Sequence, residues 1–387
     1  MKILIPLHPY VHRPGVVFIP EDTQSKGLMG LIHAPWWWQL NDSEKHTAQL
    51  FKEAGYRTYL IGFNHIDFEN PERLDYDQIP AISNAEETVQ EKISLINASD
   101  NNNKPFMAKV GFTEVHRPYR QQKDREKGIT IPPWIQDSNQ VRQDFAEFQG
   151  SIKYLDRCVG RIIEALEESK IGDETLILFT SDHGIPYPGA KWSSRKTGIE
   201  VPLILYQKDT SLVGGKVYPD LISNVDILPT LLDWSDIEIP ERIEGFSFKD
   251  ILTGKTEEAP RQEAYSQYTV DMKRDNASRS IITDKYHLIY YFSAGRSVKY
   301  PVAVNLKDFA AHKARCETEG VRPFVQLFDL KKDPYELENL GEKEEYQNIV
   351  KNMKHKLFNW MQEVNDPLLN GPLGHPYYER ALAELRE

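Results

Sequence analysis

"LILFTSDHGIPYPGAKWSSRKTGIEVPLILY", residues 176–206, contains the features that predict the fold of this chain. Two uninterrupted apolar runs, residues 175–180 and 201–206, enclose a polar loop that is rich in glycine and proline. Short apolar runs bounded by such residues are typical of strands that are buried on both faces of a sheet. The segment therefore predicts two buried strands, with Asp182 and His183 directly after the first of them.

The chain before this segment alternates between helical patterns and strand patterns. Apolar residues spaced by three or four predict helices within residues 41–55, 84–96 and 140–170. Residues 58–63 and 105–112 are short apolar runs that predict further strands. This alternation predicts an α/β fold, in which helices flank a mostly parallel or mixed sheet.

The pattern changes after about residue 255. Residues 263–270, 278–292 and 322–330 alternate apolar and polar side chains, which is typical of half-exposed antiparallel strands. An amphipathic helix is predicted to close the chain over residues 345–364. We therefore expect a main domain over residues 24–255 and a smaller α+β subdomain over residues 256–387.

Composition excludes several classes of partner. The chain has 387 residues, 40% of them hydrophobic, and a formal net charge of −11, which argues against nucleic acid. No run approaches 18 apolar residues, so we expect no membrane span. Two cysteines, Cys158 and Cys316, make no disulfide framework and leave the cellular compartment undetermined.

Polar side chains follow several of the predicted strands where each strand ends. His65, His116 and the Asp182–His183 pair stand after three successive strands, and Lys191 lies in the loop that follows the pair. Each has an ordinary structural explanation by itself, such as capping a turn. Because ligands of parallel α/β sheets collect beyond the carboxyl ends of strands, we expect the four groups to lie together. Such a group could hold a divalent cation and a tetrahedral dianion.

Residues 176–206 closely resemble a signature region of the type I sulfatases, which belong to the alkaline-phosphatase-like superfamily. Further segments resemble that family in the same order, so the resemblance covers residues 24–371: "TAQLFKEAGYRTYLIGFNH", "PFMAKVGFTEVHRPY", "YLDRCVGRIIEALEE", "NVDILPTLLDWSDIEIP" and "LFDLKKDPYELENL". The resemblance implies that Asp182 and His183 are metal ligands, usually to calcium (Ca2+). It also implies that Lys191 and His116 hold the sulfate and assist the leaving oxygen, and that His65 contacts the nucleophile or the sulfate.

The sequence departs from the family pattern at several positions. Phe63 stands where the family has the Lys of Lys-x-His, and Val115 replaces the Pro before His116, which we regard as a minor change. Sulfatases also open with a strand that ends in paired Asp ligands, followed by Cys/Ser-x-Pro/Ala-x-Arg, whose Cys or Ser is oxidised to formylglycine. Neither Cys158 nor Cys316 stands in such a motif.

The place where the family carries its nucleophile falls near Tyr10. A shifted reading frame there permits Cys-Thr-Pro-Ser-Arg and then Tyr-Thr-Gly-Arg-Tyr, so we hypothesise that residues 1–23 are a frame-shifted, non-native N-terminus. On this hypothesis the first strand of the sheet and the formylglycine belong to a longer, intact protein. We therefore expect the chain as written to be inactive.

The leading interpretation is a sulfatase that hydrolyses sulfuric esters, with a sulfated small molecule or glycan as substrate. One alternative is a phosphoester or phosphonate hydrolase of the same superfamily. Another is a noncatalytic glycan-binding protein, because "PWWWQ" (residues 35–39) offers aromatic faces that could stack on sugar rings.

Overall fold

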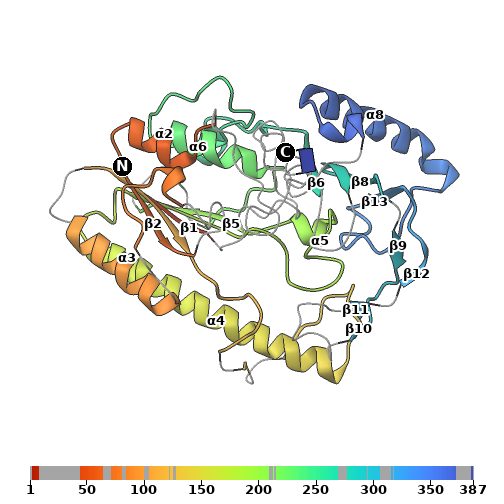
Figure 1. The fold of residues 1–387 in the computed structure, drawn as a ribbon, viewed down its shortest axis with the longest axis horizontal. Coiled ribbons are helices and arrows are strands. Elements are labelled where there is room, and N and C mark those ends of the chain that lie inside the picture. The colour runs from red at the N-terminus through yellow and green to blue at the C-terminus, as the bar shows by residue number, and fades with distance from the viewer. Residues whose placement is uncertain are drawn as a thin grey trace.

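The computed structural model describes residues 2–7, 44–63, 71–80, 84–99, 104–121, 123–124, 128–208, 212, 215–268, 277–293, 295–305, 315–316, 318–371 and 385–386 (Figure 1). Two larger sheets lie side by side in Figure 1, one built from the first half of the chain and one from the second. The predicted boundary near residue 23 lies outside the described residues, and the one at residue 255 stays a prediction.

The main sheet has five strands in the order β2-β3-β1-β4-β5. Their bounds are Lys2–Leu7 (β1), Arg57–Gly62 (β2), Phe106–Gly111 (β3), Thr175–Thr180 (β4) and Leu203–Tyr206 (β5). The first four strands pair in parallel, and β5 runs antiparallel to β4. The prediction of a mostly parallel, mixed sheet is therefore confirmed.

Strand β1 corrects one expectation. On the hypothesis of a non-native N-terminus the first strand of the sheet would be missing, whereas Lys2–Leu7 pairs with both β3 and β4 in the middle of the sheet. The physical reason is that "KILIPL" is a short, mainly aliphatic run, which suits a central parallel strand. It contains no Asp, so the departure from the family's paired acidic residues remains.

Two layers of helices cover the main sheet. On one face, α2 (Thr47–Glu53) and α6 (Ile227–Trp234) bury side chains such as Phe51 and Leu231 against Leu60 and Leu178 of the strands. On the other face, α3 (Ala85–Ser99) and α4 (Asn139–Glu168) pack against the opposite side chains of the same strands. Each fully buried aliphatic or aromatic side chain contributes about 1.5–3 kcal/mol, so the two layers hold the sheet rigid.

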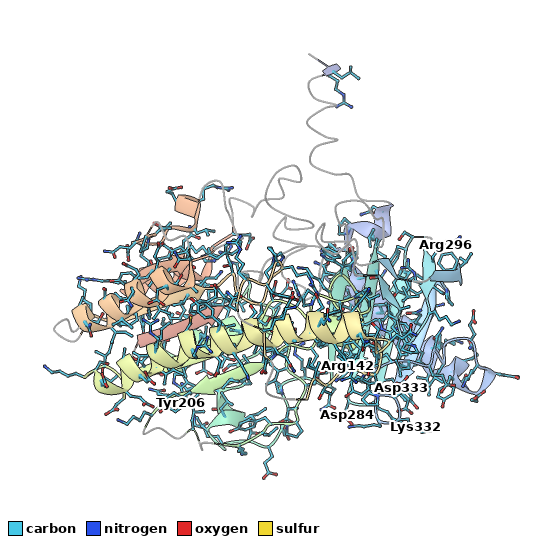
Figure 2. The ribbon with its side chains drawn as sticks, turned by 90° about the horizontal axis from the view of Figure 1, so that it is seen from below. Arg142, Tyr206, Asp284, Arg296, Lys332 and Asp333 are labelled. Carbon is cyan, nitrogen blue, oxygen red and sulfur yellow. The ribbon has the colours of Figure 1, made fainter. Side chains whose placement is uncertain are left out.

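Helix α4 connects the two halves of the molecule. It begins after Ser138, whose side chain accepts the backbone N–H of Val141 at 3.3 Å, and ends at Glu168. Its 30 residues span about 45 Å at 1.5 Å per residue. Figure 2 shows Arg142, in its first turn, near the C-terminal subdomain, and Figure 1 shows its last turns beside α3.

The second half of the chain forms the predicted α+β arrangement. Four antiparallel strands have the order β13-β8-β7-β6, with bounds Glu263–Tyr268 (β6), Ser278–Thr283 (β7), Tyr286–Tyr291 (β8) and Val325–Asp329 (β13). Helix α8 (Gln347–Glu363) packs Met353, Leu357 and Trp360 onto one face of this sheet. We call the part from β6 onward the C-terminal subdomain.

Shorter elements complete the described chain. They are α5 (Lys196–Ile199), α7 (Lys249–Leu252), the paired strands β9 (Arg296–Val298) with β12 (Thr318–Val321) and β10 (Val304–Asn305) with β11 (Arg315–Cys316), and the 3-10 turns η1 (Pro71–Leu74), η2 (Asn224–Asp226), η4 (Glu344–Tyr346) and η5 (Pro367–Asn370). None of the helices in the described ranges is long and apolar enough to cross a membrane.

Candidate active site

The carboxyl ends of the parallel strands line up across the main sheet. Gly111 of β3 is in register with Gly62 of β2 and with Leu7 of β1, and Leu7 is in register with Thr180 of β4. The loops that leave these strands therefore start from one edge, as the sequence predicts. His65 follows Gly62 but lies outside the described residues, so its position stays a prediction.

Asp182 and His183 lie at this edge, two and three residues beyond the end of β4. Their exposed fractions are 3% and 9%, and the Nε2 atom of His183 lies 3.1 Å from Oδ2 of Asp182. The Nδ1 atom of His183 lies 2.7 Å from the carbonyl oxygen of Gly184, which can only accept, so Nδ1 carries the hydrogen. In the neutral ring, the lone pair of Nε2 then faces a carboxylate.

Two acceptors at that distance repel each other unless a cation or a proton stands between them. A carboxylate oxygen and an imidazole nitrogen are both ordinary ligands of divalent metal ions. The pair therefore fits a metal ion as part of its ligand set. No group of three or more His, Cys, Asp or Glu side chains close enough to hold a metal ion occurs within the described ranges.

The loop of Lys191 is a compact unit that begins directly after His183. The backbone N–H of Gly184 donates to Gly198 at 2.9 Å, which brings the two ends of residues 184–199 together. A Cβ at Gly184 would stand 1.9 Å from the carbonyl oxygen of Thr197, so only glycine fits this close approach. Inside the loop, the N–H of Lys191 donates to Ile185 at 3.1 Å. Lys191 and the Asp182–His183 pair thus belong to one folded segment.

His116 reaches the same edge from the loop after β3, and one carboxylate of α4 joins this loop to that of Lys191. Arg117 donates to both oxygens of Asp144, with Nη1 to Oδ1 at 2.6 Å, and the hydroxyl of Tyr187 donates to Asp144 as well. Burial raises the pKa of Tyr187, so its phenol keeps the proton that it donates. Asp144 therefore connects the strand-end loops of β3 and β4.

Two strained residues flank the predicted site residues. Val115, directly before His116, has φ 69°, and Trp192, directly after Lys191, has φ 64°. A β-branched residue in the left-handed region is a true outlier, and such strain is concentrated at functional sites. Proline holds φ near −65°, so Val115 has a conformation that the family's Pro cannot adopt. This replacement is therefore more than a minor change.

The structure does not support Cys158 as a nucleophile. Cys158 lies in the middle of α4 with 2% of its surface exposed, and burial raises the pKa of its thiol. A buried thiol with a raised pKa is a weak nucleophile. This finding agrees with the sequence, in which Cys158 stands in no nucleophile motif.

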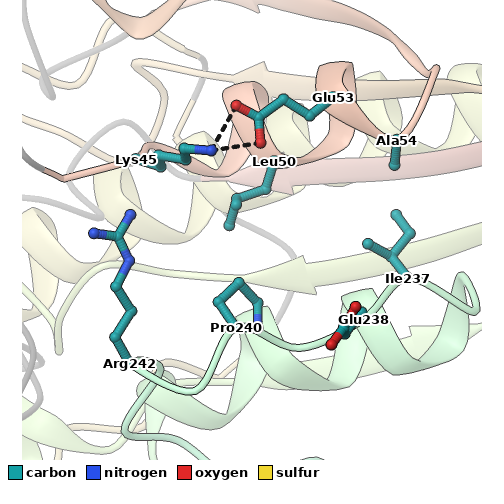
Figure 3. Close-up of a pocket in the computed structure, with 8 residues that line it drawn as sticks. All are labelled: Lys45, Leu50, Glu53, Ala54, Ile237, Glu238, Pro240 and Arg242. Atoms are coloured by element: carbon teal, nitrogen blue, oxygen red, sulfur yellow. Dashed lines mark hydrogen bonds and ion pairs between the residues drawn. The ribbon is translucent and has the colours of Figure 1, made fainter.

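A surface cavity of about 620 Å³ lies away from these residues, between α2 and the segment after α6 (Figure 3). Leu50 and Ile237 line it on facing sides, and Lys45 pairs with Glu53 at its rim, with Nζ 2.7 Å from the carboxylate. It contains none of the predicted site residues. The "PWWWQ" segment, the possible sugar platform, lies outside the described residues.

A mostly parallel α/β sheet with metal-type ligands at its carboxyl edge and an appended antiparallel subdomain is the architecture of the alkaline-phosphatase-like hydrolases. The family model "Sulfatase" matches residues 22–237, more than half of the chain. A second model, "N-sulphoglucosamine sulphohydrolase, C-terminal", matches residues 193–302. The chain belongs to the sulfatase family.

Individual relatives share modest identity. An ulvan-active sulfatase of Formosa agariphila is 28% identical over 265 residues, which cover 66% of this chain but only 44% of that enzyme. The human N-sulphoglucosamine sulphohydrolase is 23% identical over 403 residues, covering 90% of this chain and 80% of that protein. The solved structure of a 2-O GAG sulfatase superposes with a TM-score of 0.68 at 16% identity, covering 97% of this chain and 94% of the other. At that identity the superposition shows the fold alone.

The strand-end groups were predicted from the sequence, whereas the side chains that connect their loops were not. Asp144 and Tyr187 are separated from Arg117 by 27 and 70 positions in the sequence. An acidic residue on a helix is usually exposed to solvent, so the sequence around Asp144 does not indicate a buried ion pair. Arg117 lies inside the segment "EVHRPY", next to the predicted site residue His116, so its position alone points to the site.

Proposed function

We propose that this protein is a hydrolase for sulfuric esters of carbohydrates, which acts at the carboxyl edge of the main sheet. The observation that carries the proposal is the convergence of Asp182 and His183 at that edge, in one segment with Lys191. The names of the relatives support the substrate class, because they include sulfatases of ulvan and of N-sulphoglucosamine.

Each site residue has a proposed role. Asp182 and His183 would hold a divalent cation, calcium by family resemblance, which when bound neutralises the sulfate charge and polarises its S–O bonds. The ammonium of Lys191 would bind a sulfate oxygen, because a charged donor forms strong hydrogen bonds with an anion. His65 is proposed to lie on the same sulfate.

His116 is proposed to exchange a proton with the leaving oxygen. Its Nδ1 atom lies 2.6 Å from the carbonyl oxygen of Arg117, so Nδ1 carries a hydrogen and fixes the orientation of the ring. Nε2 is then the atom that takes up and releases the proton. Arg117 is itself held by Asp144, so the ring has a firm support.

The formylglycine nucleophile is proposed for the intact protein. The 387 residues contain no Cys/Ser-x-Pro/Ala-x-Arg motif, so we expect negligible turnover of sulfate esters by this chain. Robust turnover of 4-nitrophenyl sulfate, abolished by a chelator, would contradict this expectation.

The test of the site therefore measures binding. We expect calcium to raise the melting temperature of the chain, and N-acetylglucosamine 6-sulfate to bind by calorimetry in the presence of calcium. Asp182→Asn should abolish the calcium effect, because it removes a charged ligand. Lys191→Met should keep the calcium effect and weaken saccharide binding by about tenfold or more, because it removes one charge-assisted hydrogen bond.

The exposed residue Lys351 of α8 supplies the matched control, and Lys351→Met should leave both measurements unchanged. Calcium and saccharide effects that survive Asp182→Asn would overturn the proposed site. Tighter binding of glucosamine 6-phosphate than of the sulfate would favour the phosphoester hydrolase. Saccharide binding that is unchanged by chelators and is lost in Trp37→Ala would favour the noncatalytic glycan-binding protein.

A further inference from the structure

The segment that carries Lys191 is joined to the C-terminal subdomain by buried polar side chains. Arg195, which precedes α5, is 5% exposed, and Glu336, in the turn after β13, is fully buried. Ser194 adds a second connection, since its hydroxyl lies 2.8 Å from that of Ser278 on β7. In Figure 1, α5 lies between the main sheet and the C-terminal sheet.

Glu336 uses both carboxylate oxygens in this connection. Oε1 accepts from Nδ1 of His287 on β8 at 2.5 Å. Oε2 accepts the backbone N–H of Lys196 at 2.9 Å and lies 3.7 Å from Nε of Arg195. Arg195 also donates to the carbonyl oxygens of Glu336 and of Tyr335, the latter at 3.2 Å. One side chain thus contacts both the C-terminal sheet and the first turn of α5.

The surroundings keep Glu336 charged and fixed. Burial opposes the charge, but His287 and Arg195 outweigh burial and lower the pKa of the carboxyl. The rings of Tyr300 and Phe328 pack on the guanidinium of Arg195, at 4.3 and 4.9 Å from its central carbon. Glu336 also has φ 58°, a left-handed conformation that surrounding contacts must hold.

The connection continues from Arg195 to the site through the backbone. Gly198 donates to the carbonyl oxygen of Arg195 at 2.8 Å, and Gly184, next to His183, donates to Gly198 at 2.9 Å. A displacement of Arg195 would therefore move both ends of the loop. We propose that Glu336 is a positioning residue, which sets from the C-terminal subdomain the placement of residues 184–199 and hence of Lys191.

The proposal is tested with Glu336→Gln and limited trypsin digestion. The loop contains three trypsin sites, after Lys191, Arg195 and Lys196. Loss of the carboxylate leaves Arg195 with a buried, uncompensated charge, so we expect local opening of the loop. Mass spectrometry of the fragments should show cleavage at these sites about tenfold faster than in the wild type, at a temperature where both are folded.

Asp366→Asn is the matched control. Asp366 also holds a buried arginine of the C-terminal subdomain, Arg279, whose Nη2 lies 2.9 Å from Oδ1. We expect Asp366→Asn to lower the melting temperature and to leave cleavage at the three loop sites unchanged. Equal acceleration in the two variants would overturn the proposal, because the effect would then be general destabilisation.

A second readout rests on the proposed function. In the presence of calcium, Glu336→Gln should weaken the binding of N-acetylglucosamine 6-sulfate about tenfold, whereas Asp366→Asn should leave it unchanged. If the wild type binds no saccharide, the proposed function fails while the digestion still decides the role of Glu336. If the wild type binds and Glu336→Gln binds equally well with an unchanged digestion pattern, the positioning role is wrong.

His287→Gln covers the case in which Glu336→Gln does not fold. The Gln amide takes the place of Nε2, so the variant loses the Nδ1 donor to Oε1 of Glu336 but keeps the bond from Lys196 to Oε2, and the change is milder. We expect the same cleavage sites to open, with a smaller acceleration. An unchanged rate at all three sites in this folded variant would overturn the proposal.

Discussion

Lys92 of α3 is buried, and its Nζ atom has no hydrogen-bond partner among the residues that the structure describes. Its Nζ atom lies 4.7 Å from the centre of the Phe106 ring, and burial lowers the pKa of Lys92 to about 7. Burial likewise lowers the pKa of Lys109 on β3 to about 7. Both groups therefore oppose folding whenever they are protonated.

We expect Lys92→Met to raise the free energy of unfolding by about 1–3 kcal/mol at pH 6.5, because a thioether fills the site without a polar group to desolvate. Between pH 7 and 10.5 the unfolded chain binds a proton at Lys92 that the folded chain has lost. Wild-type stability should therefore rise with pH across that window. Urea unfolding at pH 6.5 and at pH 9.5 measures the free energy of unfolding at each pH. Its increase from pH 6.5 to pH 9.5 should be smaller in Lys92→Met than in the wild type.

Lys351→Met, on the exposed surface of α8, is the control and should keep the wild-type dependence on pH. A Lys92→Met variant that is less stable than the wild type at both pH values would show that Lys92 makes a net favourable contribution.

Val115 supports a second prediction at the residue scale. Val115 has a φ of 69°, which proline cannot adopt. Its backbone N–H donates to Oγ of Ser151 at 3.0 Å. Val115→Pro would lose the hydrogen bond and force the loop of His116 into another conformation. We expect the free energy of unfolding, measured with urea, to fall by more than about 1 kcal/mol.

Ser151→Ala removes only the acceptor of that hydrogen bond, so its cost should be smaller than that of Val115→Pro. A Val115→Pro variant as stable as the wild type would mean that the loop adopts the family's proline conformation in solution.

At the scale of elements, α4 determines how the two site loops are held. Asp144 in its second turn binds Arg117 and Tyr187, with only 11% of each side chain of the Arg117–Asp144 pair exposed. We expect Asp144→Asn to cost about 3–5 kcal/mol in urea unfolding, because it leaves a buried guanidinium without its counter-charge. It should also raise amide hydrogen exchange in residues 113–120 and 184–191.

An exposed ion pair at the start of the same helix serves as the control for the buried pair of Asp144. Arg142 and Asp137 form an ion pair in which nearly half of each side chain is exposed, and Arg142 stands at the surface in Figure 2. Asp137→Asn should change the stability by no more than about 1 kcal/mol. An equal loss of stability in Asp144→Asn and Asp137→Asn would refute the view that Asp144 holds the two site loops together.

Periodicity predicted most elements of this fold. The strand expected at residues 175–180 has those bounds in the structure. The helices expected at residues 84–96 and 140–170 begin and end within a few residues of the observed bounds of α3 and α4. The prediction that residues 201–206 form a strand buried on both faces is wrong for β5, which runs antiparallel to β4 and exposes 57% of Ile204. An apolar run shows neither the direction of a strand nor whether both of its faces are covered. The short strands β9 to β12 have two to four residues each, too few to show a period.

At the scale of the whole molecule, β5 is the end strand of the main sheet within the described ranges. Ile204 and Tyr206 on this strand are 57% and 41% exposed, and Figure 2 labels Tyr206 at the end of the molecule away from the C-terminal subdomain. An exposed apolar edge strand is a template for pairing with another chain. We therefore expect aggregation on heating to begin at this edge.

Ile204→Lys should reduce light scattering at 10 °C below the melting temperature, while the melting temperature itself changes little. Leu203→Lys is the contrasting variant, because Leu203 packs against the core and a charge there should lower the melting temperature. Scattering that is unchanged in Ile204→Lys would place the aggregation surface elsewhere.

The amino-acid sequence by itself determined the α/β class, the α+β subdomain and the strand ends from which Asp182, His183, Lys191 and His116 emerge. These follow from patterns within ten to thirty residues, where the period of side chains matches a helix or a strand. Only the tertiary structure decided that β1 occupies the centre of the sheet, that Asp144 joins two loops, and that Glu336 contacts α5. Those contacts join residues up to 173 positions apart, as for Lys2 and Thr175, and local periodicity carries no information about a charge that is paired across the core.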